Sequence, residues 1–127
     1  LLERRLRNMF INLYQINSEL DNDRLMFCNL KTILTANSNQ IPAHLYECVF
    51  SGELDVQDAE DVFRIFNLEQ PKDYRGRSMS VSDVVEFVHT PNKSDFYFCD
   101  SIGFAQVEFD KQSTKCLIVN HDYEMDC

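Results

Sequence analysis

The segment YRGRSMSVSDVVEF, residues 74–87, decides how the centre of this chain folds. The glycine in YRGR is typical of a turn, and the apolar run that follows is rich in β-branched and aromatic residues. Ser80, Ser82 and Asp83 stand between the two parts, and short polar side chains in such places bond nearby backbone amides. The segment therefore predicts a turn that leads directly into a core strand.

The same two serines and aspartate also resemble the beginning of a catalytic site or a phosphate-binding loop. A nucleophilic serine needs a base within hydrogen-bond reach, and hydrolase serines commonly lie in a G-x-S-x-G turn. Here the nearest preceding glycine is Gly76, four residues before Ser80, and no G-x-x-x-x-G-K-[ST] motif occurs. The spacing favours a structural role for Ser80, Ser82 and Asp83.

The remaining patterns predict an α+β domain. Alternating or β-rich runs predict strands over residues 9–16, 44–50, 83–89, 95–100, 104–109 and 115–121. SELDNDR (18–24), SGEL (51–54) and Ser101-Ile102-Gly103 read as turns, and Gly103 is suited to a positive φ. With few gaps long enough for crossovers, we expect a mostly antiparallel sheet of about five or six strands with two helices packed on it.

Two segments have helical spacing. Residues 27–37 repeat apolar residues at helical intervals before Pro42, and residues 55–67 do the same before Pro71. For the second helix, Asp55 with Asp58 three residues later has the form of an N-terminal cap. Both helices are predicted to place one apolar face on the sheet.

The cysteines and the lack of a long apolar run suggest a reducing cytosol. Five cysteines, an odd number without a C-x-x-C pair, do not form a disulfide or zinc framework. The cysteines are Cys28, Cys48, Cys99, Cys116 and Cys127; Cys48, Cys99 and Cys116 stand in apolar surroundings, where a free cysteine packs as a small hydrophobic residue. No run of 18 apolar residues and no secretory signal pattern occurs, so we expect a cytoplasmic protein.

The histidines give little indication of a metal site. His44, His89 and His121 lie far apart, and no H-x-x-x-H or H-E-x-x-H spacing occurs. Loop or half-buried histidines are the favoured interpretation, and a site formed in space with Asp or Cys stays an alternative. No cofactor is expected.

Charge is the most informative property of the sequence. The net charge is -9, although residues 1–8 are basic, and we interpret 1–8 as an extension or cloning remnant, 9–120 as one domain and 121–127 as an acidic tail. Residues 47–61 contain six acidic residues and no Lys or Arg. Such a run is commonly the solvated face of a helix; the sharper hypothesis is a phosphate-like array for a basic partner. The candidate partner contacts are Glu53, Asp55, Asp58, Glu60 and Asp61, together with Arg75 and Arg77 in a small positive patch beside Lys72.

Direct binding of DNA or RNA is disfavoured. The aromatic run Phe96-Tyr97-Phe98 could stack on bases, but base-stacking platforms lie in positively charged grooves. In this acidic chain, a strand with two buried faces explains the run more simply.

The order of elements resembles the YodL-like domain. The resemblance runs from about residue 13 to about residue 110 and is strongest across FRIFNLEQPKDYRGRSMSVSDVVEF, with HLYECVFSGEL before it and FYFCDSIGFAQVEF after it. It departs from the pattern at residues 27–30 and has no counterpart after Asp110. The resemblance implies a protein-contact module of mobile genetic elements from Gram-positive bacteria, without established catalytic residues.

These observations together lead to one favoured function and two alternatives. The favoured function is a non-enzymatic counter-defence protein, of anti-CRISPR or antirestriction type, that blocks the loading of guide RNA or DNA on a basic nuclease. A regulatory domain for a host cytoskeletal, cell-wall or conjugation protein is the first alternative. The second is a metal-dependent nuclease in which Asp83 and Asp100 converge on Mg²⁺.

Overall fold

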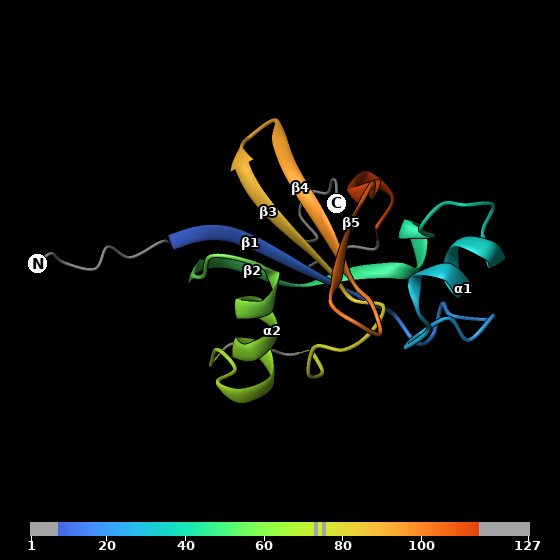
Figure 1. Ribbon diagram of the computed structural model, residues 1–127, viewed down its shortest axis with the longest axis horizontal. Coiled ribbons are helices and arrows are strands. Elements are labelled where there is room, and N and C mark those ends of the chain that lie inside the picture. Colours follow the sequence, from blue (N-terminus) through green and yellow to red (C-terminus); the bar gives the residue numbers. More distant parts are fainter. Residues whose placement is uncertain (1–7, 73, 75, 115–127) are drawn as a thin grey trace, which may run out of the picture.

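Five antiparallel strands form a single sheet in the order β2-β1-β3-β4-β5 (Figure 1). The computed structural model describes residues 8–72, 74 and 76–114. The strands are β1 (Asn8–Ile16), β2 (Tyr46–Asp55), β3 (Val84–Thr90), β4 (Lys93–Cys99) and β5 (Phe104–Val107). The helices are α1 (Leu30–Ala36) and α2 (Ala59–Leu68), with short 3₁₀ turns at Ala43–Leu45 and Lys111–Ser113. The predicted α+β class, with two helices on an antiparallel sheet, is confirmed.

Helix α2 covers one face of the sheet. Ile11 and Leu13 on β1 and Val85 on β3 point to this face and pack in one cluster with Val62 and Phe66 of α2. Successive side chains of a strand point to opposite faces, so the odd-numbered residues of β1, β3 and β4 share this side. The aromatic ring of Phe66 also contacts Phe50 and Tyr74, which closes the cluster.

The opposite face is covered by α1 and by the chain that follows β5. Tyr14, Val84 and Phe98 point to this side and pack with Ile33 of α1 and with Phe109. The Phe109 ring lies 5.0 Å from that of Tyr14 and 5.2 Å from that of Tyr46, on the β1–β2 side of the sheet. Both sheet faces are therefore covered, which explains why the first four residues of β3 are all buried.

Two predicted boundaries of β2 and α2 are wrong. SGEL is not a turn: β2 continues through it, and its pairing with β1 runs to Asn8↔Asp55 across a bulge at Leu13/Tyr14. Long-range pairing overrides the local turn preference of Ser-Gly. The N-cap of α2 is Asp58, not Asp55, so the helix begins one turn later than predicted.

The other boundaries are close to the prediction. β1 begins at Asn8, and α1 begins at Leu30 rather than 27, because Asn29 caps it by accepting a hydrogen bond from the backbone N of Thr32. Gly103 has φ 70°, as its place in a turn predicted. The strand predicted over 115–121 and the acidic tail lie outside the described residues.

Candidate protein-binding groove

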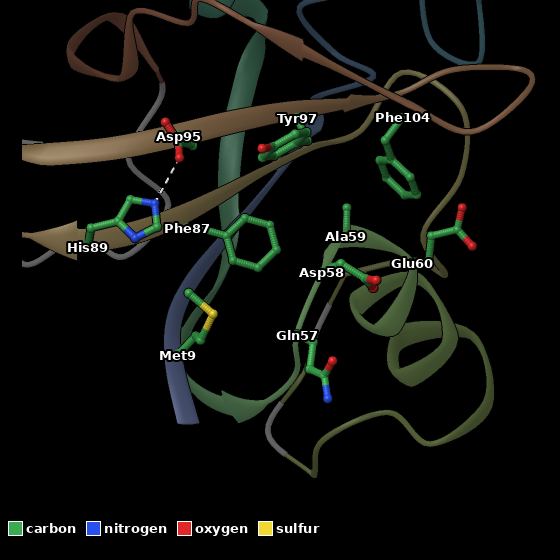
Figure 2. Close-up of a pocket in the computed structure, with 10 residues that line it drawn as sticks. All are labelled: Met9, Gln57, Asp58, Ala59, Glu60, Phe87, His89, Asp95, Tyr97 and Phe104. Atoms are coloured by element: carbon green, nitrogen blue, oxygen red, sulfur yellow. Dashed lines mark hydrogen bonds and ion pairs between the residues drawn. The ribbon is translucent and has the colours of Figure 1, made fainter. Parts of the chain in front are cut away.

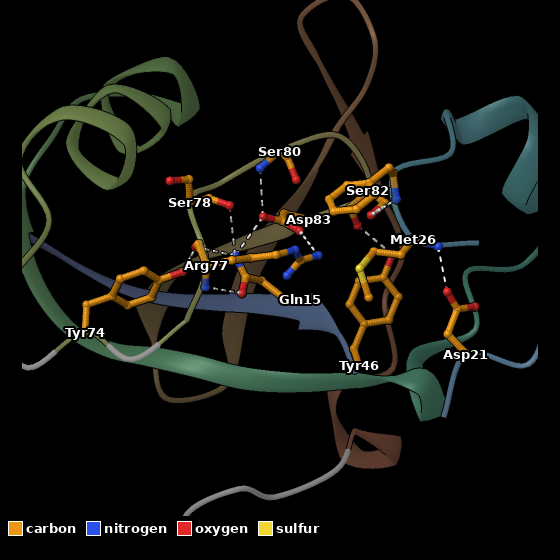
Figure 3. A network of polar contacts seen from close by, with 11 residues as sticks. Gln15, Asp21, Met26, Tyr46, Tyr74, Arg77, Ser78, Ser80, Ser82 and Asp83 are labelled. Atoms are coloured by element: carbon orange, nitrogen blue, oxygen red, sulfur yellow. Dashed lines mark hydrogen bonds and ion pairs between the residues drawn. The ribbon is translucent and has the colours of Figure 1, made fainter. Parts of the chain in front are cut away.

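Ser82 is a structural residue of the turn before β3 (Figure 3). It is fully buried, its Oγ accepts a hydrogen bond from the backbone N of Phe27 at 3.1 Å, and its carbonyl accepts one from the Tyr46 hydroxyl at 2.7 Å. Its φ of 88° is unusual for a residue with a side chain. These two hydrogen bonds connect the turn at Ser82 to the segments that contain Phe27 and Tyr46. Because Ser82 is fully buried, a substrate has no access to its hydroxyl.

Asp83 organises the preceding loop from inside the protein. Its Oδ2 accepts hydrogen bonds from the Ser80 backbone N at 2.9 Å and from Gln15 Nε2 at 3.0 Å. Its Oδ1 lies 3.2 Å from Arg77 Nη2. Burial raises the pKa of Asp83 to about 7, although Arg77 opposes the rise. The local-amide role predicted for this aspartate is present, with Gln15 and Arg77 as additional partners.

Arg77 belongs to this buried cluster as well. Its guanidinium carbon lies 5.1 Å from the ring centroid of Phe27, and 28% of its side chain is exposed. Arg77 was predicted as a partner contact, but most of its guanidinium contacts are made with Asp83 and Phe27 of the same chain. Lys72 is exposed, and Arg75 lies outside the described residues.

Gly76 is required by a close approach. A Cβ at this position would lie 2.5 Å from the Tyr74 hydroxyl and 2.8 Å from Gln15 Oε1, which no side chain tolerates without displacing them. The Tyr74 hydroxyl donates to the backbone carbonyl of Arg77. The glycine thus permits the loop to close over Gln15.

The five acidic candidates do not form one patch. Glu53 and Asp55 are exposed on β2 and alternate with Leu54, which packs in the α2 cluster, so they point to the other face. The remaining three lie at the N-terminal end of α2. Asp58 accepts from the backbone N of Asp61, and Asp61 accepts from that of Gln57 and pairs with Arg64.

A groove opens where β3 and β4 extend past the N-terminal end of α2 (Figure 2). Its volume is about 340 Å³. The floor is apolar and the rim is polar, and the residues that line it are Met9, Gln57, Asp58, Ala59, Glu60, Phe87, His89, Asp95, Tyr97 and Phe104.

The charge of this groove is negative. Its lining contains the carboxylates of Asp58, Glu60 and Asp95, one histidine, and neither Lys nor Arg. Asp95 is fixed by His89, whose Nε2 lies 2.8 Å from Oδ2, and by Gln106 Nε2 at 3.3 Å from Oδ1. The end of a helix ordinarily attracts anions, but here the chain's own carboxylates already occupy that position. The groove therefore suits a cation next to an apolar group.

A second depression adjoins the groove at Glu60 and Phe104, which line both. It is mainly apolar, with Phe63 and Met79 among its lining residues, and has a volume of about 370 Å³. The Phe63 and Phe104 rings meet edge to face at 6.3 Å. Ser80 also lines it, and its Oγ is buried without a hydrogen-bond partner among the described residues.

The sequence does not predict most groove residues, because they come from five elements: β1, the start of α2, β3, β4 and β5. Only Asp58 and Glu60 had been predicted as contacts. The alternation in Phe96-Tyr97-Phe98 was the available signal: Tyr97 faces the groove, whereas Phe96 and Phe98 pack on the other side of the sheet. The interpretation of this run as a strand with two covered faces is confirmed.

The described residues give no support to a metal site. They contain no group of three or more His, Cys, Asp or Glu side chains that could hold a metal ion. Asp100 Oδ1 accepts hydrogen bonds from the backbone N of Leu30 and of Ser101, whereas Asp83 accepts one from the backbone N of Ser80. The two carboxylates therefore bind different segments of backbone. His44 is exposed, and His121 lies outside the described residues.

The described cysteines and helices add two further facts. Cys28, Cys48 and Cys99 are free thiols. Within residues 8–114, no described helix has the length and apolar character needed to cross a membrane.

Comparison with known proteins identifies the family. No curated protein and no solved structure matches the chain. The family model of the YodL-like domain matches residues 10–109, from the second residue of the expected domain to the buried Phe109. This match covers most of the 127 residues, including both helices and all five strands except the first two residues of β1. The chain therefore belongs to the YodL-like domain family.

Proposed function

We propose that this domain is a non-enzymatic, protein-binding inhibitor encoded on a mobile genetic element. In this proposal it acts in the bacterial cytoplasm as a counter-defence protein of anti-CRISPR or antirestriction type. It binds a basic surface of a nucleic-acid-handling nuclease and blocks the loading of guide RNA or DNA.

The acidic groove beside α2 is the observation that carries this proposal. Carboxylates of Asp58, Glu60 and Asp95 surround an apolar floor formed by Phe87 and Tyr97. Protein interfaces combine such an apolar centre with a polar rim, and complementary charge accelerates the encounter with the correct partner.

The overall charge supports the same mode of action. At a net charge of -9, the chain is repelled by nucleic acid and attracted to surfaces that bind nucleic acid. A carboxylate array that occupies a phosphate-binding surface excludes guide RNA or DNA by direct competition. Inhibition then requires no catalysis by the domain itself.

The test is a cleavage assay with purified guide-free CRISPR effector nucleases and restriction enzymes. The domain is added either before or after guide RNA or DNA is loaded. We expect inhibition of DNA cleavage when it is added first and much weaker inhibition when it is added last. Association should slow as salt is raised, because the attraction between exposed charges is screened.

Two isosteric double variants separate charge at the groove from net charge. Glu60→Gln with Asp95→Asn removes two groove carboxylates, and Glu19→Gln with Asp23→Asn removes two exposed carboxylates from the loop before α1. We expect the first variant to weaken inhibition about tenfold and the second about twofold or less. If none of the nucleases is inhibited, or if both variants behave alike, the proposal is wrong.

A further inference from the structure

We infer that the groove and its adjoining depression bind an extended segment of the partner that carries a Lys or Arg close to a large apolar side chain. This inference deepens the proposed function by naming the chemistry of the partner at this site. It rests on the proposed function only for the statement that the ligand is a protein.

The groove is chemically suited to the cationic side chain. Glu60 is exposed and, among the described residues, makes no ion pair, while Asp95 is held in place by His89 and Gln106. The aromatic ring of Tyr97 lies in the same lining (Figure 2). A guanidinium or ammonium group between a carboxylate and an aromatic ring gains both a charge-assisted hydrogen bond and a cation–π contact.

The adjoining depression is suited to the apolar side chain. Phe63, Met79 and Phe104 line it, and the exposed fraction of Phe63 is 37% although it is a large hydrophobic residue. Burying such exposed aromatic surface stabilises a complex by roughly 25 cal/mol for each Å² removed from water. A buried aromatic or aliphatic anchor is also the usual centre of an interface.

The connection between the two depressions indicates an extended ligand. Glu60 and Phe104 line both, so they form the ridge over which a bound segment would pass. In an extended chain, side chains at positions i and i+2 point the same way, roughly 7 Å apart. Such a segment can place a cation in the groove and an apolar group in the depression, with one residue above the ridge.

Charge complementarity distinguishes this ligand from the alternatives. An acidic or phosphorylated peptide would face three carboxylates in the groove lining. A purely apolar peptide would leave those carboxylates partly desolvated and unpaired, which is unfavourable.

The experiment uses the full chain and a fluorescein-labelled peptide, Ser-Gly-Phe-Ser-Arg-Ser-Gly, with terminal groups blocked. Two control peptides replace its Arg by Glu or its Phe by Ser. Amide-resolved NMR on the unmodified protein maps where each peptide binds, and fluorescence anisotropy gives the affinity. We expect shifts at Glu60, Tyr97 and Phe104 with the first peptide, and an affinity at least about tenfold lower for either control.

Groove variants provide the second measurement. Glu60→Gln and Phe104→Ala should each weaken binding of the first peptide about fivefold to tenfold, whereas Glu19→Gln should leave it within about twofold. The inference is overturned if the peptide does not bind, shifts residues elsewhere, or binds as well after its Arg becomes Glu.

The two proposals fail in different ways. Peptide binding at the groove without inhibition of any nuclease removes the counter-defence function and leaves the recognition of a basic, apolar segment intact. Nuclease inhibition that is unaffected by Phe104→Ala and by Glu60→Gln removes the recognition model and leaves inhibition to another surface.

Discussion

Two buried carboxylates three residues apart, Asp83 and Glu86, behave in opposite ways. Neither side chain has measurable solvent exposure. Asp83 points to the α2 side of the sheet, where Arg77, Gln15 and the Ser80 amide are its partners, and its pKa is raised to about 7. Arg77 contacts Asp83 through Nη2, and the Nε of Arg77 is buried without a hydrogen-bond partner among the described residues. This single-point contact does not offset the burial of the charge.

Glu86 points to the opposite side and is fully surrounded by donors. Its Oε1 accepts from Asn12 Nδ2 at 2.9 Å and from the Tyr14 hydroxyl at 2.8 Å, and its Oε2 accepts from Ser94 Oγ at 2.6 Å and from Lys111 Nζ at 2.7 Å. Burial raises the pKa of Glu86, but these four bonds together lower it below its ordinary value. The number and geometry of hydrogen-bond donors, rather than burial alone, thus decide whether the pKa of a buried carboxylate is raised or lowered.

The largest effect is expected from Glu86→Gln. The amide keeps the shape but places a donor against two of the four donors, and it removes the charge that Lys111 requires. We expect the free energy of unfolding at neutral pH to fall by about 3 kcal/mol, measured by urea denaturation. A loss below about 1 kcal/mol would show that the four bonds do not favour the ionised form.

The pH dependence of stability should distinguish the two carboxylates next. The folded-state pKa of Asp83 is raised from 3.8 to about 7, so the folded protein binds its proton more tightly than the unfolded chain. The stabilisation is complete below about pH 4 and is lost as pH rises through 7. Glu86 has a lowered pKa, so its stabilisation is present above its ordinary value of 4.5 and is lost as pH falls through its folded-state pKa.

Between about pH 5 and pH 7.5, Glu86 is ionised in both states and contributes no slope. Over this range we expect the Asp83 contribution to fall by about 2 kcal/mol. The measurement is the difference in the free energy of unfolding between the unmodified protein and Asp83→Asn at each pH, which isolates the contribution of Asp83. A difference that does not change with pH would mean that Asp83 is ionised throughout.

Asp83→Asn should change the free energy of unfolding in the opposite direction to Glu86→Gln. At pH 8 the unmodified protein buries a charge at Asp83 that Arg77, the Ser80 amide and Gln15 compensate only in part. The amide of asparagine removes the cost of burying that charge but loses the ion pair with Arg77. We expect the free energy of unfolding to rise by about 1 kcal/mol. Urea denaturation of both isosteric variants in parallel gives the comparison, and equal losses in both would contradict it.

The opposite environments of Asp83 and Glu86 could not be predicted from their sequence context. Both residues lie in the predicted strand 83–89, and strand alternation predicts only that their side chains point to opposite faces of the sheet. Their partners Gln15, Asn12 and Lys111 are between 25 and 74 residues away. Local propensity carries no information about such distant contacts.

Strand positions were predicted well where hydrophobic alternation is strong, and poorly where tertiary pairing overrides a turn signal. Residues 83–89 and 95–100 agree with β3 and β4 to within a few residues. The turn predicted at SGEL is wrong, because the pairing of β2 with β1 through Asp55 outweighs the preference of Gly52 for a turn. The groove was predicted only at Asp58 and Glu60, since its floor joins β1, β3, β4 and β5 across the sheet.

The smallest effect is expected at Ser82, the residue that aims Asp83 into the protein. Its φ of 88° favours glycine, whereas its Oγ accepts the Phe27 amide, so Ser82→Gly exchanges backbone strain for a lost hydrogen bond. We expect the free energy of unfolding to stay within about 0.5 kcal/mol of the unmodified protein. Ser82→Ala keeps the strain and loses the bond, and should lower it by about 1 kcal/mol in the same urea titration. If alanine were tolerated better than glycine, the strain at Ser82 would be negligible, and the inward direction of Asp83 would depend on its own hydrogen bonds alone.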